Sequence, residues 1–174
     1  PNLVARALIR KKTNLIGIIL PAIDTFFSYR INAITDFFND NNYSIMIANS
    51  QIDPDIELKN IKLLLEKQVD GIIFFGLRIK DYSILKEISD KVKIVIADTT
   101  LPELLFPTII QNDYESSLLI MKHLIENGHK KIGFIKGHSD LSTSERFRAY
   151  TDTLARNNIP MKEEYVKTGS YSTR

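Results

Sequence analysis

The sequence predicts an α/β fold, a doubly wound parallel sheet with helices on both faces. Short apolar runs rich in Ile, Val and Leu alternate along the chain with amphipathic segments of helical spacing. The runs are almost continuously apolar, which is typical of parallel strands that are covered on both faces. Since such crossover connections are right-handed, the helices wind onto both faces of the sheet. The length of 174 residues suits one domain, or one and a fraction.

Seven strands are expected, each bounded by turn-forming or polar residues. The first, LIGIIL at residues 15–20, is apolar throughout and stops at Pro21. A turn at Asp53 and Pro54 separates the second strand from the helix that follows it. The other strands are expected at residues 44–49, 70–76, 92–98, 107–113, 130–137 and 164–172.

Five helices are expected between these strands. In the first, Ile31 and Ile34 recur at helical spacing and define the apolar face. Gly128 stands where a left-handed cap would end the fourth. The helices are expected at residues 28–41, 56–68, 81–90, 115–128 and 144–157.

Composition excludes several classes of protein. The chain has no Cys, so disulfides and thiolate chemistry are absent, and a reducing compartment is the simplest fit. No apolar run approaches the roughly 20 residues that span a bilayer, and no secretory pattern is visible. The chain also lacks nucleotide-binding fingerprints, and its three His residues lack metal-ligand spacing. A cytoplasmic protein without metal, cofactor or enzymatic activity is therefore expected.

The first twelve residues, PNLVARALIRKK, form a basic tip. They carry Arg6, Arg10, Lys11 and Lys12 among apolar side chains, and they contain no acidic residue. Since the whole chain has a net charge of only +2, the remainder is slightly acidic. A local basic tip indicates a polyanionic partner at this end, although a frayed helix with solvated charges is the ordinary alternative.

Polar and aromatic residues follow several of the expected strands. Ligands of doubly wound sheets bind at the carboxyl ends of the strands, so these residues are candidates for a binding site. Aromatic rings and charged hydrogen-bonding groups together suit a small polyhydroxylated ligand. Each residue alone also has a structural explanation, since an Asp often caps a helix and a Phe pair can be plain core. The candidates are Asp24, Phe26, Phe27, Arg78, Asp98, Asp113, Thr143 and Arg146.

Five segments, in this order and spacing, resemble the LacI/GalR family of bacterial transcription regulators. The resemblance covers essentially all of the chain. The segments are PNLVARALIRKKTNLIGIILP, DTFFSYRINAITDFFNDNNYSIMIANS, QVDGIIFF, HLIENGHKKIGFIKG and ERFRAY.

The resemblance implies a type I core like that of periplasmic binding proteins, with two α/β subdomains. It assigns residues 1–12 to a hinge helix in the DNA minor groove and residues 13–129 to the first subdomain. Residues 130–174 would be the start of a second subdomain that is incomplete in this chain. The chain is therefore expected to be a fragment that lacks the DNA-reading headpiece and part of the effector cleft.

The resemblance also assigns roles to residues. Leu8 matches the hinge leucine that wedges between base pairs of operator DNA, and the four basic residues of the tip would neutralise phosphates. In the effector site, Phe26 and Phe27 match the pocket aromatics, and Arg146 matches the motif arginine. Asp113 also matches, although Tyr114 follows it where Asn is usual, and Ala149 replaces the motif glycine.

The expected function is therefore that of a homodimeric, effector-responsive repressor. Its effector would be a small sugar-like ligand, a sugar or a sugar phosphate, in the cleft between subdomains. An alternative is an extracytoplasmic sugar-binding protein of a transport system, which shares the core fold. That alternative needs a leader or anchor and gives the basic tip no role. An enzyme on the same fold would need catalytic motifs that the chain lacks.

Overall fold

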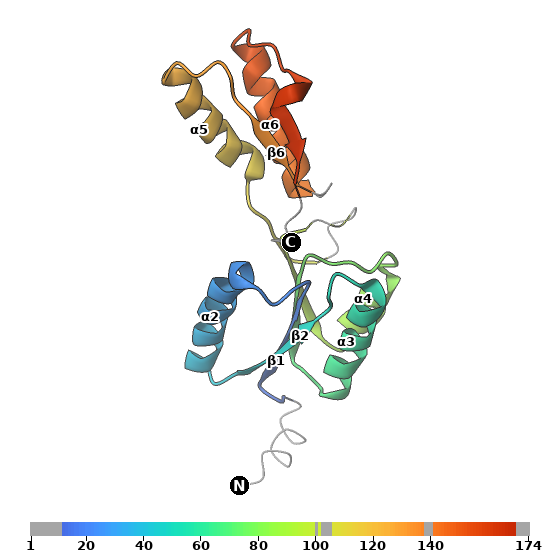
Figure 1. The fold of residues 1–174 in the computed structure, drawn as a ribbon. Coiled ribbons are helices and arrows are strands. Elements are labelled where there is room, and N and C mark those ends of the chain that lie inside the picture. The colour runs from blue at the N-terminus through green and yellow to red at the C-terminus, as the bar shows by residue number, and fades with distance from the viewer. Residues whose placement is uncertain (1–11, 100, 102–105, 138–140, 170–174) are drawn as a thin grey trace. The chain divides into compact units, whose positions relative to one another are not determined.

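The computed structural model describes residues 12–99, 101, 106–137 and 141–169. They form two compact units, which divide between Ile109 and Ile110 (Figure 1). The resemblance put the boundary between subdomains after residue 129; in the structure, the helix at Asp113–Glu126 packs within the second unit.

The first unit contains a five-stranded parallel sheet with the order β2-β1-β3-β4-β5. The central strand of the five is β3, and the two longest strands, β1 and β2, pair over six residues. The predicted α/β fold class, with a parallel sheet, is confirmed. The strands are β1 (Leu15–Leu20), β2 (Ser44–Asn49), β3 (Gly71–Phe75), β4 (Lys93–Ala97) and β5 (Thr108–Ile109).

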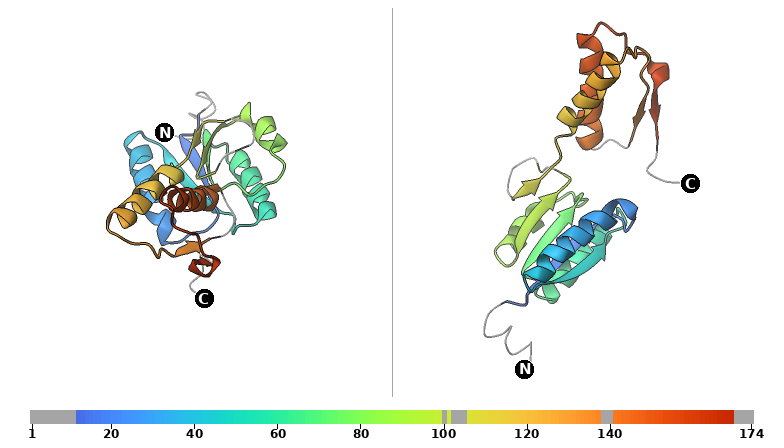
Figure 2. Two further views of the ribbon diagram at one scale, coloured as in Figure 1. Left: turned by 90° about the horizontal axis from the view of Figure 1, so that it is seen from above. Right: turned by 90° about the vertical axis from the view of Figure 1, so that its left-hand side faces the viewer.

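Helices cover both faces of this sheet, as Figure 1 shows. One face is covered by α2 (Thr25–Asp40), which lies across the strands in the right-hand view of Figure 2. The opposite face is covered by α3 (Pro54–Glu66) and α4 (Ser83–Ser89). Side chains of β1 alternate between the faces: Ile18 packs on the α2 side and Ile19 on the α3 side.

Local chemistry explains where the helices of the first unit begin. The Asp53 carboxylate accepts hydrogen bonds from the backbone N–H groups of Asp55 and Ile56 at the start of α3. Pro54 occupies the first turn, where its missing N–H costs nothing. The Asp24 carboxylate caps α2 in the same way by accepting from the backbone N–H of Phe27.

The second unit is smaller. It contains α5 (Asp113–Glu126), α6 (Leu141–Arg156), a short 3₁₀ turn (Glu163–Tyr165) and a two-stranded parallel sheet. That sheet pairs β6 (Phe134–Lys136) with β7 (Val166–Thr168). Both helices lie on one side of the pair in Figure 2. Met121, Tyr150 and Phe134 pack there, whereas Ile135 on the other face is exposed.

Gly17 in β1 makes room for α3. A methyl group at this position would lie 2.6 Å from Leu64 Cδ1, and the Leu64 side chain is fully buried. We therefore expect Gly17→Ala to lower the free energy of unfolding by about 1–3 kcal/mol through overpacking. Urea unfolding of the protein measures the change.

Gly71→Ala is the matched control, because it adds the same methyl group to the neighbouring strand β3. There the nearest atom would be 3.4 Å away, in ordinary contact. Its expected effect is smaller than about 1 kcal/mol in either direction. Equal losses in the two variants would contradict the close approach of β1 and α3.

Candidate functional site

The carboxyl edge of the first sheet brings together only some of the expected residues. Asp24 caps α2, so its carboxylate already has a structural role. Phe27 is buried in the core, where its ring packs edge-on against Phe75 at 5.8 Å. Phe26 is 61% exposed, so of the two aromatic candidates it alone offers a ring to a ligand.

A cation that the sequence reasoning missed lies beside Phe26. The guanidinium of Arg30 covers the Phe26 ring at 4.0 Å from its centroid, and Arg30 Nη1 lies 3.4 Å from Asp98 Oδ2. Asp98 follows β4 directly, and its backbone adopts a left-handed φ of 58°. Arg30 follows Phe26 by four residues on α2, so helical spacing from Phe26 was the signal that would have found it.

Arg78 is held at the same edge by a buried carboxylate. Glu57 of α3 is 1% exposed, and its Oε2 accepts hydrogen bonds from the backbone N–H groups of Arg78 at 2.8 Å and Ile79 at 2.7 Å. Glu57 Oε1 is buried without a hydrogen-bond partner among the described residues. Burial raises the pKa of Glu57, while these two backbone hydrogen bonds and the charge of Arg78 oppose the rise. Glu57 lies four residues before Ile61 and seven before Leu64, so helical spacing placed it on the buried face of α3 and was the signal that would have found it.

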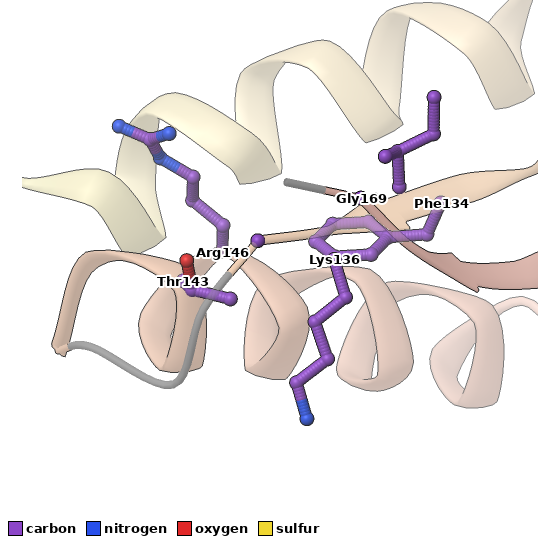
Figure 3. Close-up of a pocket in the computed structure, with 7 residues that line it drawn as sticks. Phe134, Lys136, Thr143, Arg146 and Gly169 are labelled. Carbon is purple, nitrogen blue, oxygen red and sulfur yellow. The ribbon is translucent and has the colours of Figure 1, made fainter. Parts of the chain in front are cut away.

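In the second unit, Asp113 and Arg146 form an ion pair. Asp113 opens α5 after its cap residue Asn112, and Arg146 Nε donates to Asp113 Oδ1 at 2.7 Å. Arg146 also lines a pocket of about 160 Å³ at the carboxyl ends of β6 and β7. Figure 3 shows Arg146 and Thr143 rising from α6, with Arg146 directed at α5 and Lys136 pointing away from both.

Tyr114 has a structural role beside this pair. Its hydroxyl donates to Asp152 Oδ2 at 2.8 Å, and this bond is the main cause of the raised pKa of Tyr114. The guanidinium of Arg148 lies over its ring at 4.1 Å. The two residues that open α5, Asp113 and Tyr114, are thus both fastened to α6.

The amino edge of the first sheet anchors the chain that leaves the basic tip. The Asp70 carboxylate accepts hydrogen bonds from the backbone N–H groups of Thr13 and Asn14, both at 2.9 Å. Lys12 is exposed and donates to the Tyr43 hydroxyl at 3.1 Å, which is the main cause of its raised pKa. The other expected DNA-binding residues, Arg6, Leu8, Arg10 and Lys11, lie outside the described residues.

The part of the chain that the structure describes contains no group of three or more His, Cys, Asp or Glu residues that could hold a metal ion. Within the same residues, no helix is both long and apolar enough to cross a membrane.

The fold and this site define an α/β ligand-binding core of the periplasmic-binding-protein type. Residues 13–174 match the family described as periplasmic binding proteins and sugar-binding domain of the LacI family. The chain belongs to this family, and the resemblance found in the sequence is confirmed.

Among curated relatives, the chain is 32% identical over 175 residues to the HTH-type transcriptional repressor PurR of Mannheimia succiniciproducens. That match covers 98% of this chain and 52% of the relative. It is also 29% identical to catabolite control protein A of Priestia megaterium, over 99% of this chain and 53% of the relative. The chain thus spans about half the length of these curated relatives.

Solved structures of transcription regulators share the fold of this chain. The transcription regulator CcpA of Lactococcus lactis superimposes with a TM-score of 0.76 at 30% identity, over 91% of this chain and 59% of that structure. A LacI-family transcriptional regulator of Lactobacillus casei with bound glucose shares the fold, with a TM-score of 0.73 at 16% identity. The match covers 88% of this chain and 58% of that structure.

Glu57 predicts a pH dependence of stability. Because its pKa in the folded state is raised above the ordinary 4.5, the stability that its neutral form provides is complete below that value. This stability is lost as the pH rises through the raised pKa. Gln at this position cannot ionise, so we expect Glu57→Gln to gain stability relative to wild type over the same pH window.

Urea unfolding of both proteins from about pH 4 to about pH 8 measures the difference. Glu66→Gln, which removes an exposed carboxylate from the end of the same helix, should follow wild type. Parallel curves for Glu57→Gln and wild type would contradict a raised pKa at Glu57.

Proposed function

We propose that this chain is the core of a cytoplasmic, effector-responsive repressor that binds operator DNA as a homodimer. One observation carries the proposal: the two edges of a single parallel sheet serve the two expected sites. Asp70 at the amino edge anchors Thr13 and Asn14, which follow the basic tip in sequence, and the carboxyl edge carries Phe26, Arg30, Arg78 and Asp98. The relatives support it, since those named are transcriptional repressors and regulators, not enzymes or transport components.

The proposed mechanism is a coupling free energy between two sites. The effector binds at the carboxyl ends of parallel strands, where rings and charged groups suit its hydroxyls. It favours one of two states of the protein, by no more than its difference in affinity for them. The two states differ in whether residues 1–12 are ordered on DNA, so that Leu8 wedges a base step and the basic residues neutralise phosphates.

The homodimer is supported by the exposed edge of the first sheet. Strand β2 pairs with β1 on one side, and Ile47 of β2 is 43% exposed. An exposed strand edge with an apolar side chain favours association with a second copy. The two hinge segments of such a dimer would then act together on one operator.

Arg146 is proposed to bind the effector. We expect Arg146→Ala to weaken effector binding about 10- to 100-fold, because a hydrogen bond from a charged group is lost. Operator affinity without effector should remain that of wild type. The measurement is operator release from the full-length protein as the effector is titrated.

Arg148→Ala is the matched control for Arg146→Ala. Arg148 lies on the same helix and pairs with Glu145, but it does not line the pocket. An unchanged dose response in Arg146→Ala would remove Arg146 from the effector site.

Leu8 is proposed to be the DNA wedge. We expect Leu8→Ala to weaken operator binding by about tenfold or more, since the lost apolar contact no longer supports the kinked base step. Effector binding should not change. Fluorescence anisotropy with operator DNA measures the loss of affinity. Leu3→Ala is the matched control, because it removes the same kind of side chain elsewhere in the tip. Wild-type operator affinity in Leu8→Ala would contradict the wedge.

A further inference from the structure

Thr13, the first residue after the basic tip, is fixed at the amino edge of the first sheet. Its backbone N–H donates to Asp70 Oδ1 at 2.9 Å, and its hydroxyl lies 2.7 Å from the carbonyl oxygen of Gln68. The next N–H along the chain, that of Asn14, donates to Asp70 Oδ2 at 2.9 Å. Asp70 in turn donates its backbone N–H to the carbonyl oxygen of Leu15 in β1 at 2.7 Å. The tip therefore joins the sheet at a defined point, beside the segment that leads from α3 into β3.

Two exposed lysines flank this point. Lys67 directly precedes Gln68, whose carbonyl oxygen contacts the Thr13 hydroxyl. Lys93 begins β4, and its backbone N–H donates to the carbonyl oxygen of Asp70 at 3.4 Å. Because neighbouring strands lie about 4.8 Å apart and β3 separates β4 from β1, the backbone of Lys93 lies about 10 Å from the start of β1. Both lysines therefore adjoin residues that hold Thr13 in place.

The charges of these two lysines are open to a partner. Neither Lys67 nor Lys93 forms an ion pair among the described residues. Asp70, the acid that contacts this segment, uses both carboxylate oxygens on backbone N–H groups. Glu66 and Asp90, exposed acids at the ends of α3 and α4, pair with neither lysine. Because solvent and salt screen exposed charges, these two acids reduce the attraction of the lysines for an anion but do not cancel it.

DNA bound by the basic tip, as proposed above, lies within reach of these lysines. Lys12 is the last residue of the tip, and consecutive Cα atoms are only about 3.8 Å apart, so DNA that Lys11 and Lys12 contact lies next to Thr13. A lysine carries a compact charge on a long flexible side chain, which suits contacts to phosphate rather than recognition of bases. The sugar–phosphate backbone of that DNA therefore lies beside Lys67 and Lys93.

We propose that Lys67 and Lys93 form a second phosphate-binding surface, on the core itself, which contacts the backbone of the DNA that the basic tip binds. Each ammonium group neutralises a phosphate and releases condensed counterions, so its contribution does not depend on base sequence. The surface rests on the proposed function, because DNA is its partner. Lys67 also lies at the C-cap of α3, where a cation stabilises the helix dipole. That structural role affects the free energy of unfolding, whereas phosphate binding affects the salt dependence of DNA affinity.

The test is the salt dependence of DNA binding by the full-length protein, measured by fluorescence anisotropy from about 50 mM to about 200 mM KCl. Lys67→Met and Lys93→Met remove the charge and keep a long unbranched side chain. We expect each to reduce the slope of log affinity against log salt by about 0.9, and to weaken binding about 3- to 10-fold at about 0.1 M salt. The double variant should lose about 1.8 of the slope. Operator and unrelated duplex DNA should lose affinity by the same factor, because phosphates carry no sequence information.

Three further variants separate charge from structure. Lys93→Arg keeps the charge and should keep the slope of wild type. Lys80→Met removes an exposed lysine from the loop after β3, at the opposite edge of the sheet, and should also keep the slope of wild type. Glu66→Gln removes the acid next to Lys67 and should strengthen the binding of both DNAs. Urea unfolding of each variant reports any loss of stability separately.

A wild-type slope in the double variant of Lys67 and Lys93 would overturn the proposal. An equal fall of the slope in Lys80→Met would also overturn it, because the effect would then belong to the net charge of the chain and not to this surface. Weaker binding with an unchanged slope would indicate lost structure and would have the same consequence. Failure of the proposed function would appear separately, as wild-type protein that binds operator no more tightly than unrelated duplex DNA. Binding to that duplex would still test the two lysines.

Discussion

The parallel pairing of the first sheet is the constraint on which the other features depend. Parallel strands bring all their carboxyl ends to one edge and all their amino ends to the other. That pairing puts Asp98 and the loop of Arg78 at the carboxyl edge, and it puts Thr13 beside Asp70 at the opposite edge. The two ends of the proposed mechanism therefore belong to one sheet, and no separate scaffold has to connect them.

Charge balance is the second organising feature of the candidate site. Three arginines lie at carboxyl edges, and each has a carboxylate close by: Arg30 has Asp98, Arg78 has Glu57, and Arg146 has Asp113. Carboxylates hold the arginines in place without giving the site a large net charge. Charge-balanced pairs of this kind are suited to hydroxyl groups, which accept from a guanidinium and donate to a carboxylate.

The fold could be predicted from the sequence, but much of the candidate site could not. Apolar runs such as LIGIIL predicted the strands because burial on both faces leaves no place for polar side chains. Phe26 and Phe27 were both predicted to line the binding site. In the structure, Phe27 of α2 is buried in the core and Phe26 is exposed. Helical spacing places Arg30 beside Phe26 on α2 and Glu57 beside Ile61 on α3, but the contacts of these two residues with Asp98 and with the loop of Arg78 form only in the folded chain.

The most direct test of the account is a measurement of coupling on the full-length protein. Operator affinity is measured with and without a sugar that binds, and sugar affinity is measured with and without operator DNA. Linkage requires both ratios to be the same factor. We predict that this common factor differs clearly from one. A sugar that binds tightly while both ratios equal one would contradict it, because the carboxyl edge would then not communicate with the DNA-binding end.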